Sequence, residues 1–325
     1  MTSSTPVLQA LAKRAAVFLV GLLVASIAIF VICQLLPGDV AGVILGQNAD
    51  PAAVERLRAK LGLDDPLPQR YLDWVGGMLT GDFGTSQVSR KPVAEQIASK
   101  FAVTGWLVLG GMALALLIAV PVGVFAAVWR RRWPGVLTSG ISQLGLAIPA
   151  FWAGIMLAYL FGARLKLLPA NGYVPFTSDP GGWAAHLVLP IVSLALVQSA
   201  VLVRYVRSAI IEVLAEDHYR TARAIGWTQF AALMRHGLRN AALSVVTVLG
   251  LQLTTLLVGA IVVESVFALP GLGSMLLTAV SQRDLIAVQS TVMVLVFAVL
   301  LVNALVDFSY VLIDPRLRSR TEVAP

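Results

Sequence analysis

The sequence predicts an all-α integral membrane protein with six transmembrane helices, and three observations support this. First, 58% of the 325 residues are hydrophobic, and the mean hydropathy is +0.84. Second, only 13% are charged, about half the share that a soluble protein needs to cover its surface. Third, the apolar residues form long blocks, and a block of about 18 residues is enough for a helix to cross the hydrocarbon core of a bilayer.

Each long block is expected to be helical, because lipid cannot satisfy backbone N–H and C=O groups. The first block runs from Ala15 to Leu36 behind Lys13 and Arg14. It is longer than the apolar core of a signal peptide, and no A-x-A-like cleavage site closes it, so we expect a span that stays. The six expected spans are 14–36, 102–128, 137–162, 186–206, 243–267 and 286–312.

The basic residues of the short loops place both termini in the cytoplasm, because inner loops are enriched in Lys and Arg. The same residues account for the net charge of +7 without a nucleic-acid partner. They are Lys13, Arg14, Arg130, Arg131, Arg132, Arg204, Arg207, Arg220, Arg223, Arg235, Arg239, Arg316, Arg318 and Arg320. The expected organisation is a cytoplasmic N-terminus with the first span (1–36), an extracytoplasmic loop (37–101), a core with five spans (102–312) and a cytoplasmic tail (313–325).

The extracytoplasmic loop 37–101 is expected to be helical. Asp50-Pro51 and Asp65-Pro66 each provide a capping aspartate followed by proline at a helix start. After the second start, apolar residues recur on one helical face at Tyr71, Trp74, Val75, Met78 and Leu79. This face either packs on the bundle or membrane surface, or docks an external partner.

The segment 207–242 is expected to form a cytoplasmic elbow, part of the core domain. A helix is predicted from Arg207 to Ile225, Gly226 breaks it, and Thr228 caps a second short helix that ends near Asn240. The apolar side of the second helix is expected at Phe230, Leu233 and Met234. Spanning the bilayer does not require such a knob, so docking of a cytoplasmic protein is favoured over a plain linker.

Motifs of several enzyme classes are absent from the sequence. There is no G-x-x-x-x-G-K-[ST] nucleotide loop and no Gly-Lys pair at all. The three histidines, His186, His218 and His236, form no HExxH, and no G-x-S-x-G occurs. The single cysteine, Cys33, cannot form an intrachain disulfide. We therefore expect no catalytic residue, metal site or cofactor in this chain, and an ATPase or ion gradient outside it must supply any energy.

Polar residues within the spans are candidates for a translocation path, since ionisable groups are costly in lipid. The candidates are Glu264, Gln252 and Gln198. Hydrogen bonding between helices is the alternative for such residues. Asp307 is expected either on the path or paired with an arginine such as Arg204.

The run from Glu216 to Gly226 resembles the EAA loop of binding-protein-dependent ABC importer permeases. Arg220-Thr221-Ala222 and Gly226 occupy the motif positions. Arg-Thr replaces the leading Glu-Ala, as in the peptide and nickel importer subfamily. His236 to Asn240 falls where the general motif ends in Ile-x-Leu-Pro, and the proline is absent, again as in that subfamily.

Further landmarks of the dipeptide and oligopeptide permeases occur in the same order along the chain. They are Leu36-Pro37-Gly38-Asp39, Leu61-Gly62-Leu63-Asp64, Gly81-Asp82-Phe83-Gly84-Thr85-Ser86, Ile148-Pro149-Ala150-Phe151-Trp152, Pro270-Gly271-Leu272-Gly273 and Asp314-Pro315-Arg316.

The resemblance implies a type I ABC importer (MetI-like) fold in a bacterial cytoplasmic membrane and a di- or oligopeptide substrate. It implies a second homologous permease, an extracytoplasmic substrate-binding protein, and cytoplasmic ATPase subunits that bind ATP and Mg. The elbow would be the coupling helix seated on an ATPase. The residues expected there are Glu216, Asp217, His218, Tyr219, Arg220, Thr221, Ala222, Arg223, Ala224, Gly226 and Trp227.

Three alternatives stay open on the sequence. In the first alternative, a protein of the same fold transports nickel, a glutathione-like peptide or an oligosaccharide. A gradient-driven secondary transporter is disfavoured because no internal repeat is visible. An intramembrane enzyme is disfavoured because a catalytic constellation is missing.

Overall fold

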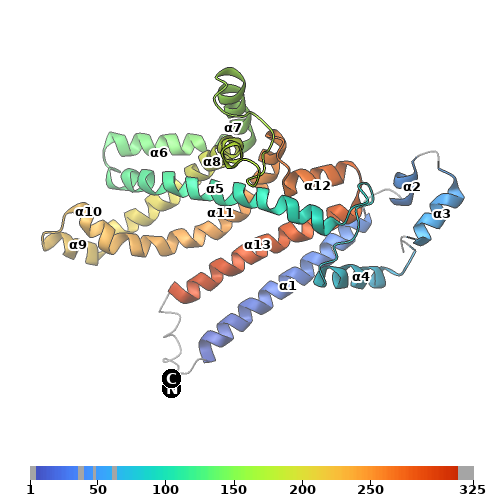
Figure 1. The fold of residues 1–325 in the computed structure, drawn as a ribbon. Coiled ribbons are helices and arrows are strands. Elements are labelled where there is room, and N and C mark those ends of the chain that lie inside the picture. The colour runs from blue at the N-terminus through green and yellow to red at the C-terminus, as the bar shows by residue number, and fades with distance from the viewer. Residues whose placement is uncertain (1–4, 36–39, 47–48, 61–63, 314–325) are drawn as a thin grey trace. The chain divides into compact units, whose positions relative to one another are not determined.

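The computed structural model describes residues 5–35, 40–46, 49–60 and 64–313, and these are helices joined by short connections (Figure 1). The all-α prediction is confirmed, since this part of the chain contains no strand beyond one isolated bridge between Thr85 and Pro92. The helices are α1 Thr5–Leu35, α2 Val40–Leu45, α3 Pro51–Lys60, α4 Leu67–Leu79, α5 Val93–Val128, α6 Trp133–Gly145, α7 Ala150–Leu157, η1 Ala158–Arg164, α8 Pro180–Ala215, α9 Asp217–Ala224, α10 Gln229–Ala232, η2 Leu233–Gly237, α11 Leu238–Val266, α12 Leu272–Ser281 and α13 Leu285–Ile313, where η1 and η2 are π-helical.

Among the described residues, five helices are long and apolar enough to cross a membrane: α1, α5, α8, α11 and α13. The sixth expected span is not one helix, and the prediction of a continuous helix over 137–162 is wrong. The segment is a pair of helices, Trp133–Gly145 and Ala150–Arg164, bent by 95°. Pro149 explains the break, because it has no N–H to donate and its ring clashes with the preceding turn. The pair supplies a sixth span if it counts as one.

Several helices extend beyond the hydrophobic blocks that predicted them. The helix α5 begins at Val93, before the expected start of the span at 102. The 36 residues of α8 span about 54 Å, well beyond a hydrocarbon core of about 30 Å. The chain passes through Pro121 in α5 and Pro190 in α8 without ending either helix.

The chain divides into two compact units, which are described separately. The core unit contains Thr104–Leu269 and 302–313. Glycines in this unit allow two pairs of helices to approach closely, α5 with α8 and α11 with α13. A Cβ at Gly111 would lie 3.2 Å from Leu194 Cβ, and one at Gly250 would lie 3.1 Å from a Val306 methyl group.

The flanking unit contains Ala12–Val103 and Pro270–Leu301. In it α1 and α13 lie side by side, with the rings of Phe18 and Phe297 6.0 Å apart. The helix α4 packs on α1, where Phe30 contacts Tyr71 and Trp74 at ring distances of 5.4 and 6.2 Å.

The helices predicted after Asp50 and Asp65 are confirmed as α3 and α4. The predicted cap at Asp65 is wrong, because the N-cap of α4 is Pro66 and no side chain caps this helix. Asp50 caps α3 by accepting a hydrogen bond from Ala52 N at 3.2 Å. The packing interpretation of α4 holds for Tyr71 and Trp74, which contact α1. Leu79, at the end of the helix, is 84% exposed.

The turn between α5 and α6 predicts a contrast between two glycines of α6. A Cβ at Gly135 would lie 2.3 Å from the carbonyl oxygen of Trp129, whereas one at Gly140 would meet nothing within 4 Å. We expect Gly135→Ala to destabilise the protein by about 1–3 kcal/mol, because backbone must move. Gly140→Ala should be neutral or stabilise by up to about 1 kcal/mol, because alanine favours helix. Thermal unfolding in detergent measures both, and equal effects would contradict the turn geometry.

Candidate coupling site and buried polar pairs

The elbow begins with a sharp change of direction at Glu216. The helix α8 ends at Ala215, and Glu216 has an extended conformation (φ −72°, ψ 148°) before α9 starts at Asp217. The predicted continuous helix from Arg207 to Ile225 is therefore wrong. The bend at Glu216 lets α9 turn so that Tyr219 and Ala222 become buried.

The end of α9 is closed by backbone hydrogen bonds around Gly226. Gly226 has φ +98°, a conformation that only glycine adopts without strain. Its N–H donates to Arg223 O at 3.2 Å, and the Trp227 N–H donates to Ala222 O at 3.1 Å. This pair of bonds is the Schellman arrangement, and it confirms the predicted helix break.

The second half of the elbow starts as predicted but does not end as predicted. Thr228 caps α10 by accepting a hydrogen bond from Ala231 N at 3.2 Å. The chain then continues through η2 directly into the span α11. No separate short helix ends near Asn240, and no loop lies between the elbow and α11. The side chains of His236 to Asn240 lie outside the described residues.

The elbow is anchored on the core unit by apolar packing. Tyr219 and Ala222, one turn apart on α9, are buried together with Ile210 and Val213 of α8. Leu233, at the start of η2, joins the same cluster and is 2% exposed. Burying such side chains contributes about 1.5–3 kcal/mol each, so the elbow is held from both of its ends.

The outer surface of the elbow carries exposed apolar side chains. Ile225, Phe230 and Met234 are 71%, 70% and 50% exposed. Of the three residues predicted for the apolar side, Phe230, Leu233 and Met234, only Leu233 is buried. Exposed apolar side chains of this size are the kind that a protein–protein contact would bury. Ile225 is absent from the sequence-predicted site; its place beside Gly226 at the tip of α9 could have identified it.

Several polar residues of the elbow pair with one another. His218 Nδ1 lies 2.8 Å from a Glu216 carboxylate oxygen, and an Arg220 nitrogen lies 3.7 Å from Asp217. Such exposed pairs contribute little stability. Arg223 donates to the carbonyl of Trp227 at 2.6 Å, and the Arg235 guanidinium lies 5.3 Å from the centre of the Trp227 ring.

The structure gives the eleven predicted coupling residues different surroundings. Tyr219 and Ala222 face inward and serve as anchors, Trp227 is half-buried, and the remaining eight are exposed. In the part of the chain that the structure describes, no three His, Cys, Asp or Glu residues gather into a group that could hold a metal ion.

The three polar residues predicted for a translocation path all take part in hydrogen bonds between helices of the core unit. The hydroxyl of Thr104 on α5 donates to Glu264 on α11 at 2.6 Å, and Glu264 is fully buried. Gln198 on α8 donates to Gln252 on α11, also at 2.6 Å. Sequence reasoning missed Thr104, because a hydroxyl in an apolar block carries no signal of its distant partner. The side chain of Asp307 lies outside the described residues, as do Leu36 to Asp39, Leu61 to Leu63 and Asp314 to Arg316.

Comparison with known proteins places this chain among transporters. Residues 119–319 match the family "Binding-protein-dependent transport system inner membrane component", and residues 7–108 match its N-terminal family. The glutathione transport system permease protein GsiC of Salmonella typhimurium is 41% identical over 91% of this chain and 94% of its own length. GsiC of Escherichia coli K12 is 40% identical over the same shares.

A solved structure, described as an amino acid ABC transporter with histidines, aligns with a TM-score of 0.45 and 18% identity. The alignment covers 67% of this chain and 91% of that one, and a likeness of this degree carries no argument. The family match spans most of the chain and the GsiC relatives cover nearly all of it. The chain therefore belongs to the inner-membrane permease components of binding-protein-dependent ABC importers.

Proposed function

We propose that this chain is one of two permease subunits through which an ABC importer moves short peptides, including glutathione-like peptides, into a bacterial cell. The substrate class rests on the 40–41% identity to glutathione permeases. The proposed topology has both termini and the segment 207–242 in the cytoplasm, and the segment 37–101 outside. A second, homologous permease would complete the pathway.

The elbow is the observation that carries the coupling role. Its inner face is clamped by Tyr219, Ala222 and Leu233, while its outer face presents Ile225 and Phe230. An apolar surface on an element that is packed firmly against the core unit is suited to insertion into a groove of an ATPase domain. Arg220 and Arg223 are exposed on α9, where they can pair with acidic residues at the edge of that groove.

The mechanism follows from how the elbow is mounted. Closure of the ATPases on ATP would move the elbow as a rigid body, and the contact with α8 and the helical continuity into α11 would pass that movement to both spans. ATP on one side and loaded binding protein on the other would then bias the bundle between inward-open and outward-open packings.

The pathway is proposed to involve Glu264, Gln252 and Gln198. An ionisable residue buried within a span is costly and is therefore a candidate for a functional role, and Glu264 is fully buried within α11. In the alternative packing of α5, α8 and α11, these polar groups would become available to the peptide backbone.

The direct test is purification of the tagged chain from its native host in mild detergent, with mass spectrometry of the associated proteins. We expect a second permease and ABC ATPase chains, and ATP-dependent uptake of labelled glutathione or dipeptides after reconstitution. A chain that purifies alone and transports in liposomes without ATP would contradict the proposal and favour a gradient-driven transporter. ATP-dependent uptake of nickel without peptide uptake would overturn only the substrate class.

Substitutions at Gly226 should reduce uptake in a graded order. A Cβ at this position would meet nothing within 4 Å, so only the backbone conformation is tested. Asparagine tolerates positive φ better than alanine, whereas proline cannot adopt it and removes the N–H that bonds to Arg223 O. We expect Gly226→Asn to keep more uptake than Gly226→Ala, and Gly226→Pro to abolish it while membrane insertion stays normal. Normal uptake by the proline variant would count against the coupling role.

Two substitutions at Glu264 separate charge from hydrogen bonding. Glu264→Gln retains an oxygen that accepts the Thr104 hydroxyl, so we expect nearly unchanged thermal stability but uptake reduced at least tenfold. Glu264→Ala removes the acceptor and should also destabilise the protein by about 1–3 kcal/mol. Full uptake by Glu264→Gln would show that the residue has only a structural role.

A further inference from the structure

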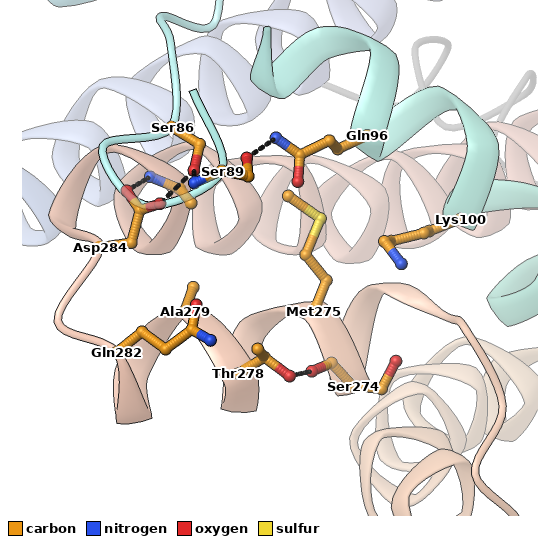
Figure 2. Close-up of a pocket in the computed structure, with 11 residues that line it drawn as sticks. Ser86, Ser89, Gln96, Lys100, Ser274, Met275, Thr278, Ala279, Gln282 and Asp284 are labelled. Carbon is orange, nitrogen blue, oxygen red and sulfur yellow. Dashed lines mark hydrogen bonds between the residues drawn. The ribbon is translucent and has the colours of Figure 1, made fainter. Parts of the chain in front are cut away.

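The flanking unit contains a polar cavity that plays no part in the coupling described above. It has a volume of about 210 Å³ and lies between the 86–89 loop, the first turns of α5, the helix α12 and the 282–284 turn (Figure 2). Its lining includes Ser89, Gln96, Lys100, Thr278 and Gln282. In the proposed topology all of these segments face the outside of the cell.

The cavity walls are held rigid by the buried carboxylate of Asp284. It accepts hydrogen bonds from the Ser86 hydroxyl and from the N–H groups of Gln87, Val88 and Ala287, the last three at 3.3, 3.4 and 3.2 Å. It thereby ties the 86–88 loop to the start of α13. The cavity is therefore formed before any ligand arrives, which lowers the entropic cost of binding.

The turn that carries Asp284 is itself fixed by the end of α12. Arg283 has φ +56°, and its N–H donates to Val280 O at 3.1 Å while the Asp284 N–H donates to Ala279 O at 2.9 Å. This is the same Schellman closure that ends α9. The Arg283 side chain is exposed.

The cavity can bind an anion because its cation is not neutralised. Among the residues that the structure describes, Lys100 makes no ion pair, and Figure 2 shows its amine on the side of the cavity nearest Met275. Asp284 is surrounded by donors and is buried, so its charge is already stabilised. Gln96 donates its amide to Ser89 Oγ at 3.1 Å, which leaves the Ser89 proton for a ligand oxygen.

The segments that form the cavity carry further positive charge. Arg90 and Lys91 are exposed in the loop that carries Ser86 and Ser89, and Arg283 is exposed beside Gln282. The acidic residues of the same segments are Asp82 and Glu95, also exposed. With Lys100 and the buried Asp284 included, these segments carry four basic and three acidic side chains, and this positive excess favours a negatively charged partner.

We propose that this cavity is a carboxylate-binding site that receives an Asp or Glu side chain of the extracytoplasmic substrate-binding protein. The family requires such a partner, and the site's place outside the cell rests on the topology given under the proposed function. A volume of about 210 Å³ accommodates one acidic side chain with its water. Lys100 supplies the charge-assisted hydrogen bond and Ser89 a second donor, and a carboxylate has two oxygens to accept them.

The test measures docking of the purified binding protein, identified by the co-purification above, on the complete transporter in nanodiscs. We expect Lys100→Gln to raise the Kd about tenfold and to reduce its dependence on salt, because one ion pair is lost. Lys100→Arg should stay within about threefold of the original protein. The matched control is Lys166→Gln, an exposed lysine in the connection between η1 and α8, which should leave the Kd unchanged.

A chemical rescue separates the charge from the fold. In a Lys100→Cys complex, attachment of an aminoethyl group through a disulfide should restore docking, whereas attachment of a methyl group should not. Unchanged docking in Lys100→Gln would overturn the proposal. A second result in Lys100→Gln would identify another source of the carboxylate. If this variant docks the binding protein normally and loses uptake of a free peptide but not of the same peptide with a C-terminal amide, the carboxylate comes from the substrate and the proposal is overturned. If the original transporter binds no binding protein at all, the proposed function itself fails.

Discussion

In the proposed function, coupling depends on the packing of Tyr219 and Ala222 against α8. A movement of the ATPase that displaces Ile225 or Phe230 would reach the spans only if the elbow does not bend relative to α8. Burial of two residues one turn apart, together with Leu233 on the far side of Gly226, clamps the elbow at both ends. The helical path from α10 through η2 into α11 then leaves no loop in which the movement could dissipate.

The same backbone device closes helices at several functional points of the chain. The helices α4, α9, α11 and α12 all end in the paired hydrogen bonds of a Schellman motif, with Gly81, Gly226, Ala268 and Arg283 at positive φ. Each closure satisfies carbonyl groups that the helix end would otherwise leave without donors. It also fixes the direction of the chain that follows, which positions the elbow in the core unit and Asp284 in the flanking unit.

Much of the fold was predictable, because a long apolar block must form a helix in lipid. Glycine and proline mark many of the helix ends in the remaining segments. The starts of α3 and α4, the break at Gly226 and the cap at Thr228 follow from local chemistry. Hydrophobicity alone hid the break at Pro149. The exposure of Phe230 and Met234 was not predictable, because a periodic apolar face looks the same whether it faces a core or a partner. Thr104 with Glu264, and Ser86 with Asp284, are separated by 160 and 198 residues, and no local pattern records such contacts.

The most direct test of the coupling site places a photo-crosslinking amino acid at Phe230 in the transporter as it exists in the membrane. Light should join this chain to an ABC ATPase subunit, and the same group at Lys166, outside the cell in the proposed topology, should give no such product. The yield at Phe230 should change when ATP is trapped, because closure of the ATPases moves the groove around the elbow. A position 230 that crosslinks only to lipid, or never to an ATPase, would contradict the assignment of the elbow as the coupling element.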